Sequence, residues 1–534
     1  MADPTTAAPA AVEPGAAGAG GLVTGEPTAD EATSDEATAD DPGGLPAGER
    51  LRRRVAGVTW PQGLVAGLVV VYVAWFTGRS LDIHHALGSS TYDVALYDQG
   101  VWLLSRFEAP FVTLMGRNLF GDQTSFVLLL LVPLYWIWPS AGVLFLSQSL
   151  VIGLGAIPVF LASRRLLGSE RLAVVPAAAY LLHPAVGWTN LENFHPDAFL
   201  GLFVGGAIWA ALERRWVAYA AFVVLALSVK EDVSLVVVPL GIWVALRRDR
   251  RIGALTVVGS VAWMAFAMLV VMRGLIGVPT RNTWRIPFGG PGGLVETTLR
   301  DPGALLAHLR SDGRPSYLLQ MTAPVAWAFL RRPSVAAISA LVLFTNVLST
   351  FWYQYQVEYH YGLIAVPALC IGAAWGIGAL RDEGHRRSLA VGAVGVAALV
   401  TSFLWSPVPW GRTPQFVGDP GTAWATAARE IIDDVPPGAI VSAHYRITPH
   451  VAHRREIYQF PVPFRSVLYG PNGNVDGPRL PERAERVEYV VLPTALGDDP
   501  IAADWALVRS AFVEVESNDS WALYRRDPDV ALPT

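Results

Sequence analysis

Long apolar runs alternate with short arginine clusters through the middle of the chain. A membrane-spanning helix needs about twenty mostly apolar residues. The apolar stretch 216–246 is too long for one helix, and we interpret it as a helical pair that turns at Lys230, Glu231 and Asp232. Together with the single runs, this pattern predicts an α-helical polytopic membrane protein with about eleven transmembrane helices. The single runs lie at 58–76, 142–162, 172–189, 197–213, 252–273, 316–330, 333–350, 361–380 and 388–406.

The arginine clusters predict how the chain is oriented in the membrane. Short loops rich in Lys and Arg remain in the cytoplasm. If every cluster is cytoplasmic, the N-terminus is cytoplasmic and the C-terminus lies outside. Segment 124–138 then cannot span, so we expect a partly embedded helix within a first outer loop, residues 77–141. The clusters are Arg50, Arg52, Arg53 and Arg54; Arg164, Arg165 and Arg171; Arg214 and Arg215; Arg247, Arg248, Arg250 and Arg251; Arg331 and Arg332; and Arg381, Arg386 and Arg387.

The two ends of the chain lack this alternation. Residues 1–49 hold ten acidic residues and no basic one, in a background of Ala, Pro, Gly and Thr. Such a segment buries too little apolar surface to offset its chain entropy, which predicts a disordered acidic cytoplasmic tail. After a transmembrane domain at 50–409, residues 410–534 have the pattern of an extracytoplasmic α/β domain. We expect a helix at 423–433, strands at 439–443 and 487–492, and a hairpin formed by 512–516 and 521–524.

The composition agrees with a multi-pass protein of the plasma membrane. Of 534 residues, 52% are hydrophobic and only 16% are charged, whereas a soluble domain carries about a quarter charged residues. The only cysteine, Cys370, lies in an apolar run, which excludes a disulfide framework and a cysteine-based metal site. No feature of the charge pattern indicates nucleic-acid binding, and the expected environment is the lipid bilayer.

Ionisable residues of a distinct kind gather at the predicted outer ends of the helices. The cytoplasmic loops hold arginine and little else, whereas five separate segments bring acids, histidines and the single lysine to the outer face. Ionisable residues at membrane depth are costly and persist mainly in cavities, pairs or functional sites. The pattern predicts one polar cavity open to the outside. Its candidate residues are Asp93, Tyr97, Asp98, Glu192, His195, Asp197, Lys230, Glu231, Asp232, Glu358 and His360.

Three of these residues lie in the first outer loop. If residues 92–99 are helical, Asp93 and Tyr97 share one face at i,i+4, while Asp98 points elsewhere. A carboxylate near the membrane surface can act as general base toward an acceptor hydroxyl or amine. The alternative is that the acids only cap and solubilise a surface helix.

The later segments also allow two interpretations each. Asp197 follows a proline and suits the first turn of a helix, but the neighbouring Glu192 and His195 could together with it ligate a divalent metal. Lys230 either contacts a phosphate, oriented by the two acids after it, or forms a structural charge cluster with them.

Glu358 and His360 follow the aromatic run 351–353, so they belong either to an interfacial aromatic belt or to the lining of the site. No other cofactor is indicated by the sequence.

Four motifs of the chain resemble a family of predicted bacterial and archaeal membrane proteins defined by domain of unknown function 2079. They are Tyr-Asp-Val-Ala-Leu-Tyr-Asp-Gln at 92–99, Gly-Asp-Gln-Thr-Ser-Phe at 121–126, Asn-Phe-His-Pro-Asp at 193–197 and Val-Lys-Glu-Asp at 229–232. The resemblance covers roughly residues 85–460.

The order of elements is also similar to that of C-type glycosyltransferases of the protein mannosyltransferase and aminoarabinose transferase kind. Carried over, Asp93 and Tyr97 match the catalytic Asp and Tyr of their first outer loop, and Lys230 matches a later lysine. Val94 stands where their motif has Glu, and Gln123 stands where related sequences often have His.

The resemblance implies an inverting membrane glycosyltransferase. It would move a hexose or pentose from a polyprenyl-phosphate donor to an envelope glycan, lipid or protein acceptor. Two other functions are consistent with the sequence. One is a transporter or flippase of lipid-linked or envelope precursors, although such proteins typically show polar residues through the full membrane depth and inverted repeats. The other is a non-catalytic envelope scaffold, which would not require a lysine within the membrane.

Overall fold

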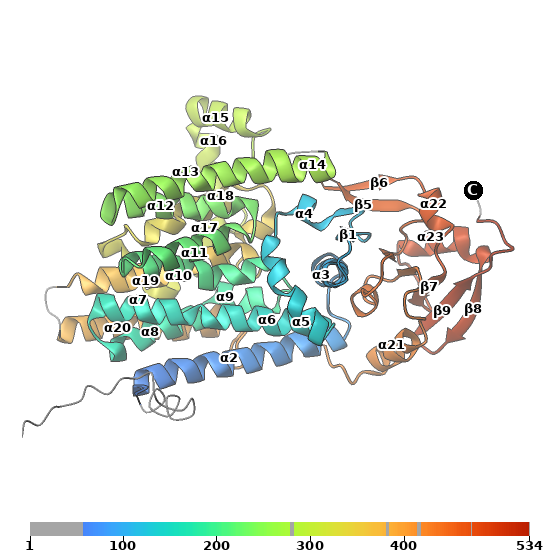
Figure 1. The fold of residues 1–534 in the computed structure, drawn as a ribbon, viewed down its shortest axis with the longest axis horizontal. Coiled ribbons are helices and arrows are strands. Elements are labelled where there is room, and N and C mark those ends of the chain that lie inside the picture. Colours follow the sequence, from blue (N-terminus) through green and yellow to red (C-terminus); the bar gives the residue numbers. More distant parts are fainter. Residues whose placement is uncertain (1–56, 278–281, 381–383, 414–417, 471–472, 533–534) are drawn as a thin grey trace, which may run out of the picture. The chain divides into compact units, whose positions relative to one another are not determined.

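The computed structural model describes residues 57–277, 282–380, 384–413, 418–470 and 473–532. The expected acidic tail, residues 1–49, lies outside these ranges. Within residues 59–534, Figure 1 shows the helices gathered on one side and the main sheet on the other, with α3 (Leu96–Ser105) between them. The protein is mostly helical, and its sheet is small and formed by residues near the C-terminus, as predicted.

Five helices among the described residues are long and apolar enough to cross a membrane. They are α2 (Trp60–His85), the pair α6 (Ala141–Leu154) and α7 (Ala156–Leu167), the run Arg250–Ile276 from α13 (Arg250–Phe266) to α14 (Arg273–Ile276), His360–Gly378 with α19 (Val366–Gly378), and α20 (His385–Trp405). A sixth span exists if α8 (Glu170–Leu182) and α9 (Pro184–Leu191) cross together. These two helices meet at a 44° bend, because Pro184 begins a new helix capped by His183.

The remaining apolar helices are shorter than a typical span. They include α10 (Leu200–Leu212), α11 (Trp216–Leu227), α12 (Ser234–Arg247) and α18 (Ala340–Leu348). The predicted helical pair is confirmed, since α11 and α12 flank a turn that carries Lys230, Glu231 and Asp232. The predicted count of eleven spans is not confirmed by these lengths.

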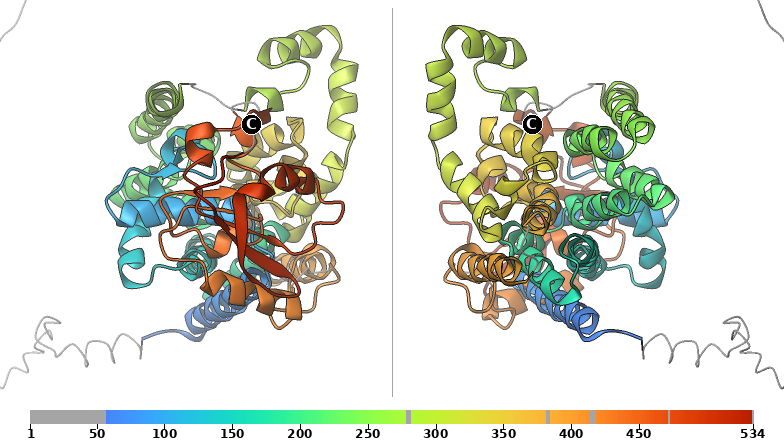
Figure 2. Two further views of the ribbon diagram at one scale, coloured as in Figure 1. Left: turned by 90° about the vertical axis from the view of Figure 1, so that its right-hand side faces the viewer. Right: turned by 90° about the vertical axis from the view of Figure 1, so that its left-hand side faces the viewer.

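One predicted span has a different structure. The segment 316–330 is not a continuous helix: α17 (Arg314–Thr322) gives way to short 3₁₀ turns, and Ala326 and Trp327 have positive φ angles of 50° and 51°. Pro324 lies just before this break, and the left-handed conformation at two successive residues ends the helix. α15 (Pro291–Arg300) and α16 (Pro302–Arg310), which precede α17 in the chain, stand out from the other helices (Figures 1 and 2).

The C-terminal part forms a five-stranded sheet with the strand order β4-β3-β7-β9-β8. The strands are β3 (Val441–Ala443), β4 (Ile457–Gln459), β7 (Tyr489–Pro493), β8 (Phe512–Ser517) and β9 (Trp521–Arg526). β3 is parallel to β4 and β7, and β8 and β9 form the predicted antiparallel hairpin. The predicted helix is present as α21 (Ala423–Asp433). Smaller elements are β5 (Ser466–Gly470), β6 (Gly473–Gly477), α22 (Pro481–Ala484) and α23 (Ile501–Val508).

The segment 77–141, predicted above to be the first outer loop, packs against this C-terminal part. It contains a π-helical turn at Thr91–Ala95, α3, β1 (Phe111–Val112), β2 (Arg117–Asn118), α4 (Leu119–Asp122) and α5 (Val132–Ile137). The Thr91 hydroxyl lies 2.6 Å from that of Thr448, and Thr113 exchanges hydrogen bonds with the backbone of Ile457. The side-chain amide of Gln99 donates to the backbone carbonyl of Arg454. These contacts fix α3, which carries Asp98, and the π-helical turn before it, which carries Asp93.

Candidate functional site

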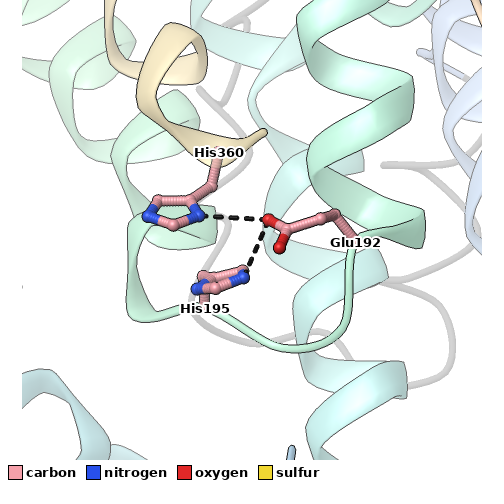
Figure 3. A group of neighbouring side chains, drawn as sticks. All are labelled: Glu192, His195 and His360. Atoms are coloured by element: carbon pink, nitrogen blue, oxygen red, sulfur yellow. Dashed lines mark hydrogen bonds and ion pairs between the residues drawn. The ribbon is translucent and has the colours of Figure 1, made fainter. Parts of the chain in front are cut away.

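Glu192, His195 and His360 form a compact group at the ends of three apolar segments (Figure 3). Glu192 follows α9, His195 precedes the 3₁₀ turn Pro196–Phe199, and His360 begins the segment that leads into α19. The Glu192 Oε2 atom lies 2.8 Å from His195 Nε2 and 3.1 Å from His360 Nδ1. The two imidazole rings stack with their centroids 3.7 Å apart. Three predicted site residues thus meet at one carboxylate oxygen.

A tight turn brings His195 back toward Glu192. Asn193 adopts a positive φ of 54°, a conformation that asparagine tolerates better than most residues. Gln148, on α6, holds the turn: its amide donates to the backbone carbonyls of Asn190 and Asn193, and its Oε1 accepts from the backbone N–H of His195. Gln148 has no sequence signal of a site residue, because it lies within an apolar helix 45 positions before Asn193.

The charges of this group stabilise one another. Burial raises the pKa of Glu192, but the two imidazoles outweigh burial and hold that pKa at about 2. Burial likewise lowers the pKa of His195, but the carboxylate of Glu192 outweighs it and raises that pKa to about 9.

Asp93 joins the group from the first outer loop. Its Oδ2 accepts a hydrogen bond of 3.4 Å from the Asn193 side chain. Burial raises the pKa of Asp93, and Glu192 adds to this effect, while His195 and Ser90 oppose it, which leaves a value of about 6. A carboxyl with this pKa is ionised at neutral pH and remains basic enough to accept a proton.

Lys230 and Asp197 form a buried ion pair beside these residues. Lys230 is only 5% exposed, and its Nζ lies 3.2 Å from Asp197 Oδ2. The ammonium also lies 5.7 Å from the ring centroid of Tyr361. Tyr97 is within electrostatic reach of Lys230, Asp197 and Asp93, and its hydroxyl donates to Gln123. The structure therefore brings Asp93 and Tyr97 to the same region as Lys230.

Glu231 and Asp232 follow Lys230 in the same turn, and Asp232 is within electrostatic reach of both Lys230 and Asp197. Glu231 accepts a hydrogen bond of 3.2 Å from the backbone N–H of Thr124 in the first outer loop. Both acids line a cavity of about 520 Å³ whose walls are mainly Met, Leu, Ile, Val and Pro side chains, with Arg285 on one side. Glu358 is half-buried, and no hydrogen bond or ion pair joins it to the group within the part of the chain that the structure describes.

Asp98 lies in a different environment, as its position on the helix predicted. It is 2% exposed and accepts hydrogen bonds from the Tyr135 hydroxyl at 2.6 Å and from His453 Nε2 at 2.9 Å. A second cavity, of about 380 Å³, adjoins Asp98 and is lined by His84, His450 and Arg454. The structure places Asp98 in the contact between the outer loop and the C-terminal part. His453 gave no sequence signal, since it lies 355 positions from Asp98.

The fold is similar to that of two solved structures of ArnT. The crystal structure of ArnT from Cupriavidus metallidurans bound to undecaprenyl phosphate matches with a TM-score of 0.53 and 14% sequence identity, covering 88% of this chain and 99% of ArnT. Its apo state matches with a TM-score of 0.51 and 13% identity over the same shares. No curated relative matches the chain. The chain belongs to the family described as predicted membrane protein (DUF2079), whose model matches residues 83–509.

Proposed function

We propose that this protein is an inverting membrane glycosyltransferase that moves a hexose or pentose from a polyprenyl-phosphate donor to an extracytoplasmic acceptor. The observation that carries the proposal is the convergence of Asp93, Tyr97 and the Lys230–Asp197 pair from three separate parts of the chain. A half-buried carboxylate and a lysine in one region supply the base and the phosphate-binding cation that this reaction needs. The fold likeness supports the same reaction class, and one of the similar ArnT structures holds undecaprenyl phosphate.

Asp93 and Lys230 have complementary roles in the proposed reaction. The Asp93 carboxylate accepts the proton of the acceptor hydroxyl or amine while that oxygen or nitrogen attacks the anomeric carbon. The bond between this carbon and the donor phosphate oxygen breaks, and its electron pair leaves with the phosphate. Lys230 balances the charge of the departing polyprenyl phosphate. The phosphate competes with Asp197 for the Lys230 ammonium. One displacement inverts the configuration at the sugar carbon.

The apolar cavity beside Glu231 and Asp232 is suited to the lipid part of the donor. Met264, Met268 and Met272 line it from one long helical run, and methionine side chains adapt readily to irregular apolar ligands. Arg285 lies at the same cavity and offers a second cation near the phosphate. Glu192, His195, Asp197 and His360 surround the sugar-phosphate end in this proposal, and Glu358 lies at its margin.

The orientation of the chain is part of the proposal. The site lies beside the first outer loop and the C-terminal domain, so both must face the side where the acceptor is found. This requires a cytoplasmic N-terminus and an extracytoplasmic C-terminal domain, and therefore an odd number of spans in the plasma membrane. In this proposal the shorter apolar helices also cross the membrane and bring the number of spans to the predicted eleven. The acceptor is an envelope glycan, lipid or protein.

The direct test is transfer from a radiolabelled undecaprenyl-phosphate hexose or pentose in membranes that contain the protein. We expect label to leave the lipid fraction with the wild type and to remain there with Asp93→Asn. Asp82→Asn is the matched control, because Asp82 lies on α2 in a partly exposed ion pair with Arg79. Equal transfer by Asp93→Asn and the control would exclude the proposed base. No transfer by the wild type from either donor class would contradict the proposed reaction.

A further inference from the structure

We propose that Glu192, His195 and His360 bind one divalent transition-metal ion of the zinc type. The side chains come from two distant parts of the chain and meet in one place (Figure 3). One ligand atom of each residue lies within 4.8 Å of the other two. The metal site is independent of the proposed transfer reaction, since it is defined by the side chains alone.

The distances between the candidate ligand atoms fit a metal centre. Ligands at 2.0–2.2 Å from a tetrahedral zinc ion lie roughly 3.3–3.6 Å from one another. Glu192 Oε2 lies 2.8 Å from His195 Nε2 and 3.1 Å from His360 Nδ1, and the largest separation in the group is below 4.8 Å. Side-chain rotations that shift the ligand atoms by a few tenths of an ångström to about one ångström would give this coordination.

The environment of His195 is the second, independent observation. The residue is only 4% exposed, and its Nε2 has no hydrogen-bond partner among the residues that the structure describes. This nitrogen is 2.8 Å from the Glu192 carboxylate, yet outside hydrogen-bonding geometry. A buried polar atom without a hydrogen bond is destabilising. A cation bound by both the nitrogen and the carboxylate as adjacent ligands would satisfy both groups.

The surrounding contacts hold the ligands in place. Gln148 fixes the turn that carries Glu192 and His195, through hydrogen bonds to the backbone of Asn190, Asn193 and His195. Outer contacts of this kind orient the ligands of metal sites and affect metal affinity. The stacked rings of His195 and His360 direct a nitrogen each toward the same carboxylate.

The donor set indicates the class of ion. Two imidazole nitrogens and one carboxylate favour zinc and neighbouring first-row ions over magnesium and calcium, which prefer oxygen ligands. Three protein ligands also leave a coordination position for water or another ligand, as in catalytic zinc sites. If the proposed transfer reaction is correct, an oxygen of the donor phosphate is the group suited to that position, because Asp93 and Lys230 lie nearby.

The test is metal binding by the purified full-length protein in detergent, carrying an affinity tag without histidine. After removal of metals by chelation and dialysis, zinc is added and bound metal is measured by mass spectrometry and titration. We expect about one zinc per chain, a higher melting temperature with zinc, and a visible absorption spectrum of tetrahedral type with cobalt. His195→Gln and His360→Gln should each weaken zinc binding by more than about tenfold.

His453→Gln is the matched control, because it removes another histidine paired with a carboxylate, outside the proposed site. Size-exclusion chromatography confirms that each variant is folded, and Glu192→Gln provides a third variant if one imidazole variant does not fold. Absence of stoichiometric zinc from folded wild-type protein would overturn the proposal, as would equal affinity in His195→Gln and the control. Neither measurement uses a sugar donor, so failure of the metal site is distinguishable from failure of the proposed reaction.

Discussion

Replacing Lys230 with methionine removes the positive partner of a buried carboxylate. Lys230 Nζ lies 3.2 Å from Asp197 Oδ2, and the two side chains are only 7% and 11% exposed. Coulomb's law at this distance and an effective dielectric constant of about 20 gives an attraction of about 5 kcal/mol. Breaking a buried pair from one side typically costs about 3–5 kcal/mol, because it leaves an uncompensated charge. We therefore expect Lys230→Met to lower the melting temperature clearly.

The double variant Lys230→Met/Asp197→Asn separates the structural role of Lys230 from phosphate binding. Removing both charges should restore most of the stability, since neutral replacement of a buried pair is often tolerated. Donor binding should remain weak in the double variant, because the phosphate still lacks its cation. The assay combines thermal unfolding in detergent with binding of undecaprenyl phosphate to each of the two single variants and the double variant.

Two outcomes would refute this reasoning. If the double variant regains both wild-type stability and wild-type affinity for undecaprenyl phosphate, Lys230 is a structural residue and the phosphate assignment fails. If Lys230→Met alone unfolds at the wild-type temperature, the Lys230–Asp197 ion pair does not stabilise the folded protein to the extent that its burial indicates. Asp197→Asn alone provides the internal control, because it leaves the lysine available to the phosphate.

Three further predictions concern catalysis, pH and orientation. Asp93→Asn should reduce the initial rate of sugar transfer by about 10²–10⁴-fold. Asp98→Asn should retain transfer and instead make the C-terminal domain more sensitive to limited proteolysis. Equal transfer rates in the two variants would contradict the separate roles of Asp93 and Asp98. Burial lowers the pKa of His453 but Asp98 raises it more, and the net pKa is raised. The stability gained from this pair is therefore fully present below about pH 6.5 and lost as pH rises through the higher folded pKa, so protection from proteolysis should fall with increasing pH in the wild type and not in Asp98→Asn. Cysteine introduced at Phe107, which is 86% exposed, should react with an impermeant reagent in intact cells. Cysteine introduced at Arg165 should react only after the cells are lysed. The reverse labelling pattern would overturn the proposed orientation.

The local elements of this protein could be predicted from its amino-acid sequence. The long apolar runs predicted α2 and α20 because burial in a bilayer requires only length and hydrophobicity, which are properties of one segment. The helix Ala423–Asp433 and the hairpin of β8 and β9 were likewise predicted from periodicity. The charged turn at Lys230 was recognised because a charge interrupts an apolar stretch that is too long for one helix.

Which of these residues meet depends on the packing of segments that are far apart in the sequence. Glu192 and His360 are 168 positions apart, and Asp98 and His453 are 355 positions apart. No periodicity relates such pairs, because their distance depends on how the helices and the C-terminal part pack together. Asp93 and Asp98 illustrate the difference. Their opposite directions follow from helical spacing, but only the packing of α3 between the helices and the sheet places one beside Asn193 and the other beside His453.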